Sequence, residues 1–189
     1  MPLLGWDRRA CRACATTDRE NELEYRQGEN VVIPGCGVGR ISAIETMEVE
    51  GERVQFYRID LGEKFGLMWV PTLHVEDRGV RPVMSAEQAE RTWEVIIQQE
   101  MPDVRAPWNR RQRRYTEMIM SNSPQSLAEV LGELSAVRRT KVLSFTEKKM
   151  FLQVWELLVA ELAAAMGVAR SVIVARMQAQ DMVPSMAAA

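Results

Sequence analysis

The chain has 189 residues, 47% of them hydrophobic, and a formal net charge of -2 at pH 7. That apolar content is enough for a folded core and excludes a chain that is disordered throughout. A net charge so close to zero excludes attraction of the whole molecule to nucleic acid by bulk electrostatics, so any such contact requires a local basic patch.

Cysteine and histidine usage argues against disulfide, metal and catalytic chemistry. Cys11 and Cys14 have the spacing of a zinc half-site or a redox pair, but only Cys36 and His74 remain, and they form no second pair at ligand spacing. His74 has no recognisable nucleophile partner. We therefore predict a protein that is not an enzyme and that has no cofactor and no metal.

The chain also lacks the signals of export or membrane insertion. No apolar run approaches the length of about 18 residues that a membrane span requires, and polar residues replace the apolar core that a signal peptide would have. The sequence predicts a cytoplasmic, nucleoid-associated protein with no membrane partner, and we expect a monomer.

The first half of the chain predicts short strands. Residues 1–24 show no sustained hydrophobic period and are expected to form a flexible arm. From there, β-prone segments alternate with glycines and charged pairs, which predicts strands at 31–33, 40–46, 54–59 and 67–71. Such strands within about fifty residues favour an SH3-like or Tudor-like antiparallel β-barrel over residues 25–80.

The glycines between the first two strands predict a turn. Residues 35–39 contain three glycines, which allow the positive φ angles of a tight hairpin. The segment is too short for a phosphate-binding loop and lacks the following helix that such a loop needs.

The second half predicts helices. Ser85 with Gln88 and Ser144 with Glu147 have the spacing of capping boxes, and Ser123 precedes a proline at the first position of another helix. The first helix is expected to end before residue 102, and a weaker last segment runs from 168 to about 180. Apolar residues at helical spacing predict the buried faces of these helices: Ala89, Trp93, Ile96, Ile97, Leu127, Val130, Leu131, Leu134, Val137, Phe151, Val154, Trp155, Leu158 and Leu162.

The predicted fold class is thus α+β, with a β-barrel followed by a compact all-helical domain. We place the helical domain at 84–180, a hinge near 77–84, and a tail at 181–189. Trp93 and Trp155 are expected to anchor the helical core because aliphatic residues flank them at helical spacing.

A basic segment surrounds one tryptophan at the start of a helix predicted over 108–120. Trp108 is accompanied by the arginines Arg105, Arg110, Arg111, Arg113 and Arg114. An arginine fork suits phosphate, and an indole is an apolar plate that can lean on an unstacked base. The alternative is that Trp108 is a core residue and the arginines form a solvated face, and the exposure of Trp108 separates these readings.

Several motifs, in order, resemble the CarD family of bacterial transcription regulators. They are Y25-R-Q-G28-E29-N-V31-V32-I33-P34-G35-C-G37-V-G39, A43-I44-E45-T46, G79-V80-R81, W108-N109-R110-R111, A128-E129-V130 and L143-S144-x-x-E147-K-x-M150. Each motif is weak alone, but the ordered set, from about residue 25 to 165, is specific.

The resemblance implies a function in transcription. It implies an N-terminal RNA-polymerase-interaction domain, shared with transcription-repair coupling factors, that docks on the β subunit. It also implies a helical domain whose tryptophan wedges into the minor groove of promoter DNA at the upstream edge of the bubble. Such proteins stabilise open complexes formed with the housekeeping sigma factor. On this basis the DNA-binding residues are Trp108, Arg110, Arg111, Arg113 and Arg114.

The polymerase-binding residues are expected on the barrel. An edge strand offers unpaired backbone groups, and we place the docking edge at Leu67–Val70 together with Glu45–Val49. The candidate contacts are Met47, Trp69, Val70 and Pro71. Met47 and Trp69 stand where some relatives carry arginine, which makes this edge more apolar. The alternative function is a protein-only adaptor that has lost DNA contact. This alternative would be favoured if Trp108 were buried, or if the arginines were covered by Glu117, Glu129 and Glu133.

Overall fold

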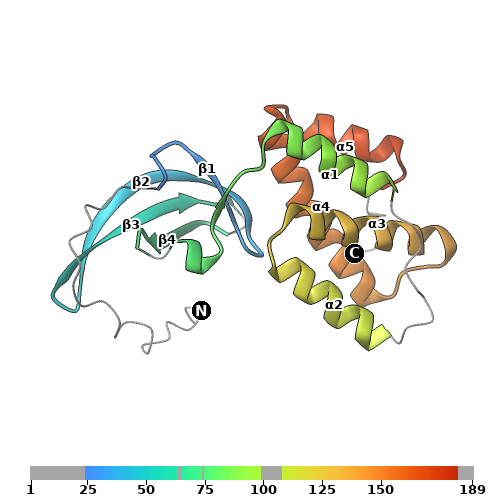
Figure 1. The fold of residues 1–189 in the computed structure, drawn as a ribbon, viewed down its shortest axis with the longest axis horizontal. Coiled ribbons are helices and arrows are strands. Elements are labelled where there is room, and N and C mark those ends of the chain that lie inside the picture. Colours follow the sequence, from blue (N-terminus) through green and yellow to red (C-terminus); the bar gives the residue numbers. More distant parts are fainter. Residues whose placement is uncertain (1–23, 64, 74, 99–107, 183–189) are drawn as a thin grey trace.

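The structure is a computed structural model that describes residues 24–63, 65–73, 75–98 and 108–182. In these residues an antiparallel sheet is followed by five helices, which is the predicted α+β class. Figure 1 shows the curved sheet and the helical bundle side by side along the long axis of the molecule. The sites of Cys11, Cys14, His74 and Arg105 lie outside the described residues.

The sheet has the strand order β4-β3-β2-β1-β5, and its pairings are antiparallel. Its strands are β1 (Asn30–Ile33), β2 (Gly37–Val49), β3 (Glu52–Asp60), β4 (Leu67–Pro71) and β5 (Arg81–Pro82). The four predicted strands are present. A 3-10 helix (Glu76–Arg78) and β5 occupy the predicted hinge. The sequence did not predict β5, because a strand of two residues is too short to show an alternation of apolar and polar residues.

No pairing among the described residues joins β4 to β5, so the predicted barrel is seen here as a curved sheet. Its apolar core contains Tyr25, Val31, Ile33, Ile41, Tyr57, Ile59, Val70, Val75 and Val80. The glycine turn is confirmed: Gly35 and Gly37 have φ angles of 73° and 92°, which a residue with a side chain adopts only under strain. The tight turn brings β1 and β2 together in the predicted hairpin.

The helices are α1 (Ala86–Gln98), α2 (Trp108–Met120), α3 (Pro124–Thr140), α4 (Phe145–Met166) and α5 (Arg170–Ala179). Both capping boxes are confirmed, since Ser85 and Ser144 exchange hydrogen bonds with Gln88 and Glu147. Gly167 ends α4 with a left-handed φ of 63°. No single described helix is long and apolar enough to cross a membrane. Taken together, α4 and α5 have the length and apolar composition of a membrane span, but their axes are bent by 119° at the break between them.

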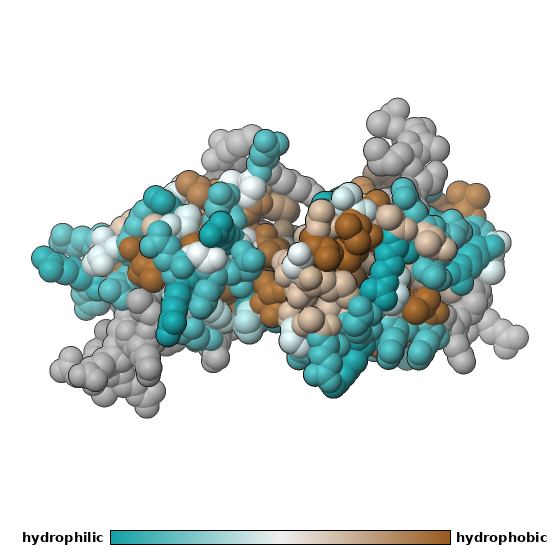
Figure 2. All heavy atoms as spheres, turned by 90° about the horizontal axis from the view of Figure 1, so that it is seen from above, coloured by the Kyte–Doolittle hydropathy of each residue, from teal (hydrophilic) through white to brown (hydrophobic). Residues whose placement is uncertain are grey.

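The helical core confirms the predicted faces with one exception. Trp93 and Trp155 are 5% and 7% exposed, and the aliphatic residues predicted inside α3 and α4 are buried. Ile97 is 41% exposed, so its assignment to the buried face of α1 is wrong. From the side of α1 and α5, Figure 2 shows apolar side chains gathered on the helical half, while polar groups cover most of the sheet half.

A buried ion pair joins the sheet to the bundle. Arg81 of β5 donates hydrogen bonds to both carboxylate oxygens of Glu161 on α4, at 2.5 and 2.8 Å, and its Nε donates to the carbonyl of Asn122 at 2.7 Å. Glu161 is 1% exposed and also accepts from the backbone N–H of Met84. The Asn122 amide in turn donates to the Gly79 carbonyl. The segment that we predicted as a hinge is therefore tied to the bundle.

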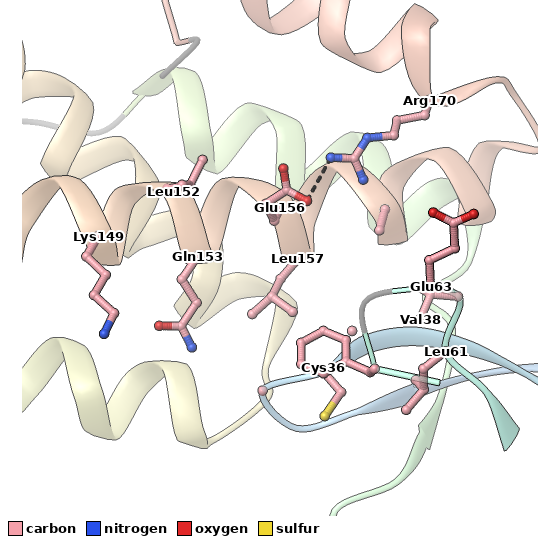
Figure 3. Close-up of a pocket in the computed structure, with 14 residues that line it drawn as sticks. Cys36, Val38, Leu61, Glu63, Lys149, Leu152, Gln153, Glu156, Leu157 and Arg170 are labelled. Atoms are coloured by element: carbon pink, nitrogen blue, oxygen red, sulfur yellow. Dashed lines mark ion pairs between the residues drawn. The ribbon is translucent and has the colours of Figure 1, made fainter. Parts of the chain in front are cut away.

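A groove lies where the glycine turn meets α4. It has a volume of about 800 Å³ and is lined by Cys36 of the turn, Leu61 just after β3 and Leu157 of α4. Figure 3 shows Leu157 pointing from α4 toward the turn. At the rim of the groove Glu156 and Arg170 form an ion pair at 2.9 Å. Burial raises the pKa of the Cys36 thiol, which disfavours the reactive thiolate.

Candidate nucleic-acid interface

Trp108 is half-buried at the first position of α2. One side of its indole packs against the helical core, where the ring lies edge-on to Tyr115 with centroids 6.5 Å apart. The Arg111 guanidinium carbon lies 5.3 Å from the indole centroid, in the range of a cation–π contact. The indole is therefore held from below while part of its surface faces solvent.

Arg111 is a support for this tryptophan and is not a surface contact. The residue is only 7% exposed, and its Nη2 lies 3.9 Å from the Glu147 carboxylate of α4. Its Nε and Nη1 are buried and have no hydrogen-bond partner in the described part of the chain. The expectation that Arg111 binds phosphate at the surface is thus not met, because helical spacing places it on the inward stripe with Tyr115.

Arg114 is engaged by an acidic residue of α3. Its guanidinium forms an ion pair with Glu133, and it also lies 5.3 Å from the ring centroid of Tyr115. The Tyr115 hydroxyl donates to the same Glu133 oxygen at 2.8 Å. Burial, together with the adjacent Glu133 carboxylate, raises the pKa of Tyr115 to about 12, so the hydroxyl keeps its proton and donates at neutral pH. This cluster of Arg114, Tyr115 and Glu133 fixes α2 on α3.

Replacing Tyr115 with phenylalanine should lower the free energy of unfolding by about 1 to 3 kcal/mol. The change keeps the packed ring and removes one donor to the buried Glu133 carboxylate. Urea unfolding followed by circular dichroism measures the loss. Thr116→Val is the control because that hydroxyl, also on α2, is exposed and bonds only within its own helix. Equal stability of Tyr115→Phe and the intact protein would show that the cluster does not fasten α2.

Besides Arg114, whose side chain is half exposed but paired with Glu133, the solvent-facing cations of α2 are Arg110 and Arg113. Arg110 is exposed and has no ion pair among the described residues. The Arg113 side chain is 85% exposed and pairs with Glu117 one turn later, at 3.1 Å. Such an exposed pair is worth only about 0.3 to 0.5 kcal/mol, so Arg113 can exchange it for a phosphate. Of the three predicted covering acids, Glu117 and Glu133 pair with arginines of α2, and no ion pair of Glu129 is seen in the described residues.

Glu147 connects the start of α4 to the arginine under Trp108. Its carboxylate accepts from the Ser144 backbone N–H at 2.8 Å and lies 3.4 Å from Lys141 Nζ. Burial opposes its ionisation, but the hydrogen bonds from Ser144 and the charge of Lys141 outweigh burial and lower its pKa below the ordinary 4.5. Sequence spacing identified Glu147 as a helix cap only, since its contact with Arg111 joins residues far apart in the chain.

The lowered pKa of Glu147 predicts a pH-dependent stability. Because the folded state holds the carboxylate more acidic than the unfolded chain does, its contribution is complete above pH 4.5 and is lost as pH falls through the folded pKa. Glu147→Gln should therefore cost about 1.5 to 3 kcal/mol at pH 7, and less at pH 3. Urea unfolding at both pH values tests this, with the exposed Glu117→Gln as control. If the difference in unfolding free energy between Glu147→Gln and the intact protein is the same at pH 7 and pH 3, the stabilising role of the ionised Glu147 is contradicted.

The candidate polymerase contacts lie on the outer face of the sheet. Met47 and Trp69 are 36% and 43% exposed, so Trp69 is not a core residue of the sheet. The Trp69 indole N–H donates to Glu45 of β2 at 3.0 Å, and Arg58 of β3 donates to the same carboxylate at 2.6 Å. Residues directly opposite in a sheet share a face, which puts Pro71 in this row through its partner on β3. We call Met47, Trp69 and Pro71, with Glu45 and Arg58, the outer sheet face.

Two expectations about this region are wrong. Val70 is 4% exposed and points into the sheet core, so its side chain cannot contact a partner. The segments Leu67–Val70 and Glu45–Val49 do not form one edge, because β3 lies between β4 and β2. β1 pairs with β2 only as far as Arg40, so the outer end of β2 still has a free side. Alternation alone cannot tell which strands are neighbours in a sheet.

Comparison with known proteins agrees with this architecture. The family described as "CarD, C-terminal domain" matches residues 94–178. A Bacillus subtilis (strain 168) protein, "Putative transcription factor YdeB", is 31% identical over 144 residues, which cover 76% of this chain and 94% of that protein. This match includes more than the helical region, since it is longer than the family match. The chain therefore belongs to the CarD family of transcription regulators.

Proposed function

We propose that this protein binds RNA polymerase through the outer sheet face and contacts promoter DNA through the start of α2, and so stabilises the open complex without catalysis. The observation that carries the proposal is Trp108, which is held from beneath by Arg111 and is partly open to solvent beside the exposed Arg110. A rigid apolar plate beside an unpaired cation suits a DNA fork, where bases lose their stacking partners.

The charges and the indole have separate roles on the DNA. Arg110 and Arg113 supply phosphate contacts, which give affinity but carry no sequence information. Trp108 enters the minor groove at the upstream edge of the bubble and delays reclosing of the strands. The different exposure of these side chains supports their separate roles. Arg110 and Arg113 face solvent, whereas the Trp108 indole packs on the helical core and therefore loses little side-chain entropy when it binds DNA.

The partner of the outer sheet face is the polymerase β subunit. Trp69 and Met47 are exposed on a face that contains a buried aromatic, Phe56, at 4% exposure, and aromatic and methionine residues are enriched at interface cores. The Glu45–Arg58 pair beside them supplies polar contacts for the rim of an interface. β4 is also an edge strand with free backbone groups for a partner strand.

The direct test is the half-life of open complexes formed by polymerase with its housekeeping sigma factor. Adding the intact protein should lengthen the half-life measured after a competitor traps free polymerase. Binding to polymerase is confirmed in the same preparation by pull-down. An unchanged half-life with binding present would contradict the proposal.

Trp69→Ala should weaken polymerase binding by about 2 kcal/mol, or roughly thirty-fold. The change removes the largest exposed side chain of the outer sheet face and leaves the Glu45 carboxylate with one partner fewer. Titration of fluorescent protein with polymerase core enzyme measures the affinity. Val172→Ala is the control, because it removes an apolar group that is 53% exposed on α5 and is not part of the outer sheet face. Equal weakening by both changes would contradict this docking face.

A protein-only adaptor is the second candidate function. The pairing of Arg113 with Glu117 and of Arg114 with Glu133 favours it, because both acids reduce the positive field of α2. In that case the intact protein would bind polymerase but leave the open-complex half-life unchanged. Cross-linking to promoter DNA in the polymerase complex separates the two functions.

A further inference from the structure

We propose that Phe145 and Val142, at the start of α4, form a second apolar contact for nucleic acid beside Trp108. The inference rests on the proposed function and adds residues from a different helix and loop to the same DNA contact. These two side chains are 85% and 83% exposed, the highest values among the large apolar residues described. An exposed apolar residue alone indicates little, so the argument depends on position and on charge.

A chain of contacts places the start of α4 next to the start of α2. The Ser144 backbone N–H donates to Glu147 at 2.8 Å, the Glu147 carboxylate lies 3.9 Å from Arg111, and the Arg111 guanidinium lies 5.3 Å from the centre of the Trp108 indole. Phe145 follows Ser144 directly in the chain. The starts of α2 and α4 are therefore neighbours in the bundle. In the proposed complex a short stretch of duplex, which rises about 3.4 Å per base pair, covers both Trp108 and Phe145.

The backbone holds these exposed side chains in a defined position. The capping box at Ser144 and Glu147 sets the first turn of α4, and Leu143, between Val142 and Ser144, is 5% exposed in the helical core. Val142 and Phe145 thus stand on either side of an anchored segment. A rigid apolar plate binds with less loss of entropy than one on a mobile loop.

The charges near Val142 and Phe145 favour a polyanion as the partner that covers them. Exposed cations lie within four residues of Val142 or Phe145 along the chain: Arg139, Lys141, Lys148 and Lys149. The acid within this segment, Glu147, is 2% exposed and is already bonded to Lys141 and Ser144. A segment with this positive excess stands out in a chain of net charge -2. Phosphates pair with such cations while a sugar or an unstacked base covers the phenyl ring.

The test compares open-complex half-lives for the intact full-length protein, Phe145→Ala, Phe145→Leu and Trp108→Ala. Phe145→Ala should shorten the half-life about tenfold, within the range for loss of one aromatic contact to a base. Phe145→Leu, which keeps apolar area but loses the flat ring, should give an intermediate value. Val172→Ala is the matched control for removal of an exposed apolar group elsewhere in the bundle.

Two further measurements separate this contact from other causes. Phe145→Ala should leave thermal unfolding unchanged, because the side chain is almost fully exposed. The open-complex half-life measured with Phe145→Ala should vary with salt concentration as steeply as the half-life measured with the intact protein, because the substitution removes no charge.

The outcomes distinguish this inference from the function on which it rests. A half-life unchanged by Phe145→Ala but shortened by Trp108→Ala overturns the second contact and leaves the proposed function standing. Weaker binding of Phe145→Ala to polymerase without DNA also overturns it, because the occupant would then be a protein. If the intact protein itself does not lengthen the half-life, the second contact fails together with the proposed function.

Discussion

Replacing Trp108 with alanine is expected to shorten the half-life of open complexes about tenfold while polymerase binding is retained. The indole supplies the apolar plate at the DNA fork, and loss of such a stacking contact costs about 1 to 3 kcal/mol. The outer sheet face, which we assign to polymerase, lies on different elements and is untouched by the change. The half-life with trapped polymerase and a pull-down of polymerase measure the two effects separately.

Two comparisons make this result interpretable. Trp108 also packs on the helical core and on Tyr115, so Trp108→Ala needs a thermal unfolding curve to show that the bundle stays folded at the assay temperature. Arg110→Ala should instead weaken DNA contact with a salt slope shallower by about one unit, the signature of one lost phosphate contact. A Trp108→Ala protein that stays folded and retains the full half-life would refute the role of the indole.

Replacing Arg81 with alanine is expected to lower the free energy of unfolding by about 3 to 5 kcal/mol. The change leaves Glu161, which is 1% exposed, as a buried carboxylate without its cation. Breaking one side of a buried pair costs this much because the remaining charge is uncompensated. It also removes the hydrogen bond from Arg81 to the Asn122 carbonyl, so the segment before α1 keeps the Asn122 amide bond to Gly79 and the Met84 bond to Glu161 as its polar links to the bundle in the described residues. Differential scanning calorimetry measures the stability, and small-angle scattering measures whether the molecule becomes longer or more variable in shape.

The chain offers a matched control for this experiment. Arg176 makes a similar two-pronged pair with Glu90, but within the bundle and with side chains 38% and 57% exposed. Glu90→Ala, which removes this pair but leaves the Arg176 guanidinium 4.3 Å from the centre of the Trp93 ring, should cost at most about 1 kcal/mol, as loss of an exposed pair does. Exchange of both Arg81 and Glu161 for methionine should recover much of the stability, since the buried charge is then absent. A small loss for Arg81→Ala would show that the pair does not fasten the two halves.

The Arg81 variant also tests how the two proposed contacts cooperate. One protein can hold polymerase and DNA together only if the sheet and α2 keep a defined distance and angle. The Arg81–Glu161 pair, and Gly37 packed so closely on α4 that an added Cβ would lie 3.2 Å from Leu157, maintain that geometry. We therefore expect Arg81→Ala to retain polymerase binding and to lose much of the open-complex effect at temperatures where it stays folded.

Much of the fold follows from local patterns in the sequence. The strand at Leu67–Pro71 and the helix at Trp108–Met120 lie where alternation, glycine turns and capping residues predicted them. The burial of Trp93 and Trp155 followed from helical spacing alone. Such features can be predicted because helix caps, turns and amphipathic faces depend on residues within a few positions of each other.

The errors concern neighbours that are distant in the chain. Arg111 and Arg114 belong to the same basic run as Arg110, yet one is buried beside Glu147 and the other is paired with Glu133. Val70 alternates with Trp69 as any strand residue does, and only the sheet core decides which of the two faces inward. Charge and alternation identify candidate residues but not the element that packs against them.

The sequence by itself thus determined the α+β class, the helix caps, the family resemblance and the placing of Trp108 at a helix start. The tertiary structure decided which arginines face solvent, that β3 separates the two predicted docking segments, and that Arg81 binds Glu161 across the junction. The physical reason is one of range. Backbone conformation depends mainly on nearby residues, whereas the burial and pairing of a charge depend on side chains that only folding brings within a few ångströms.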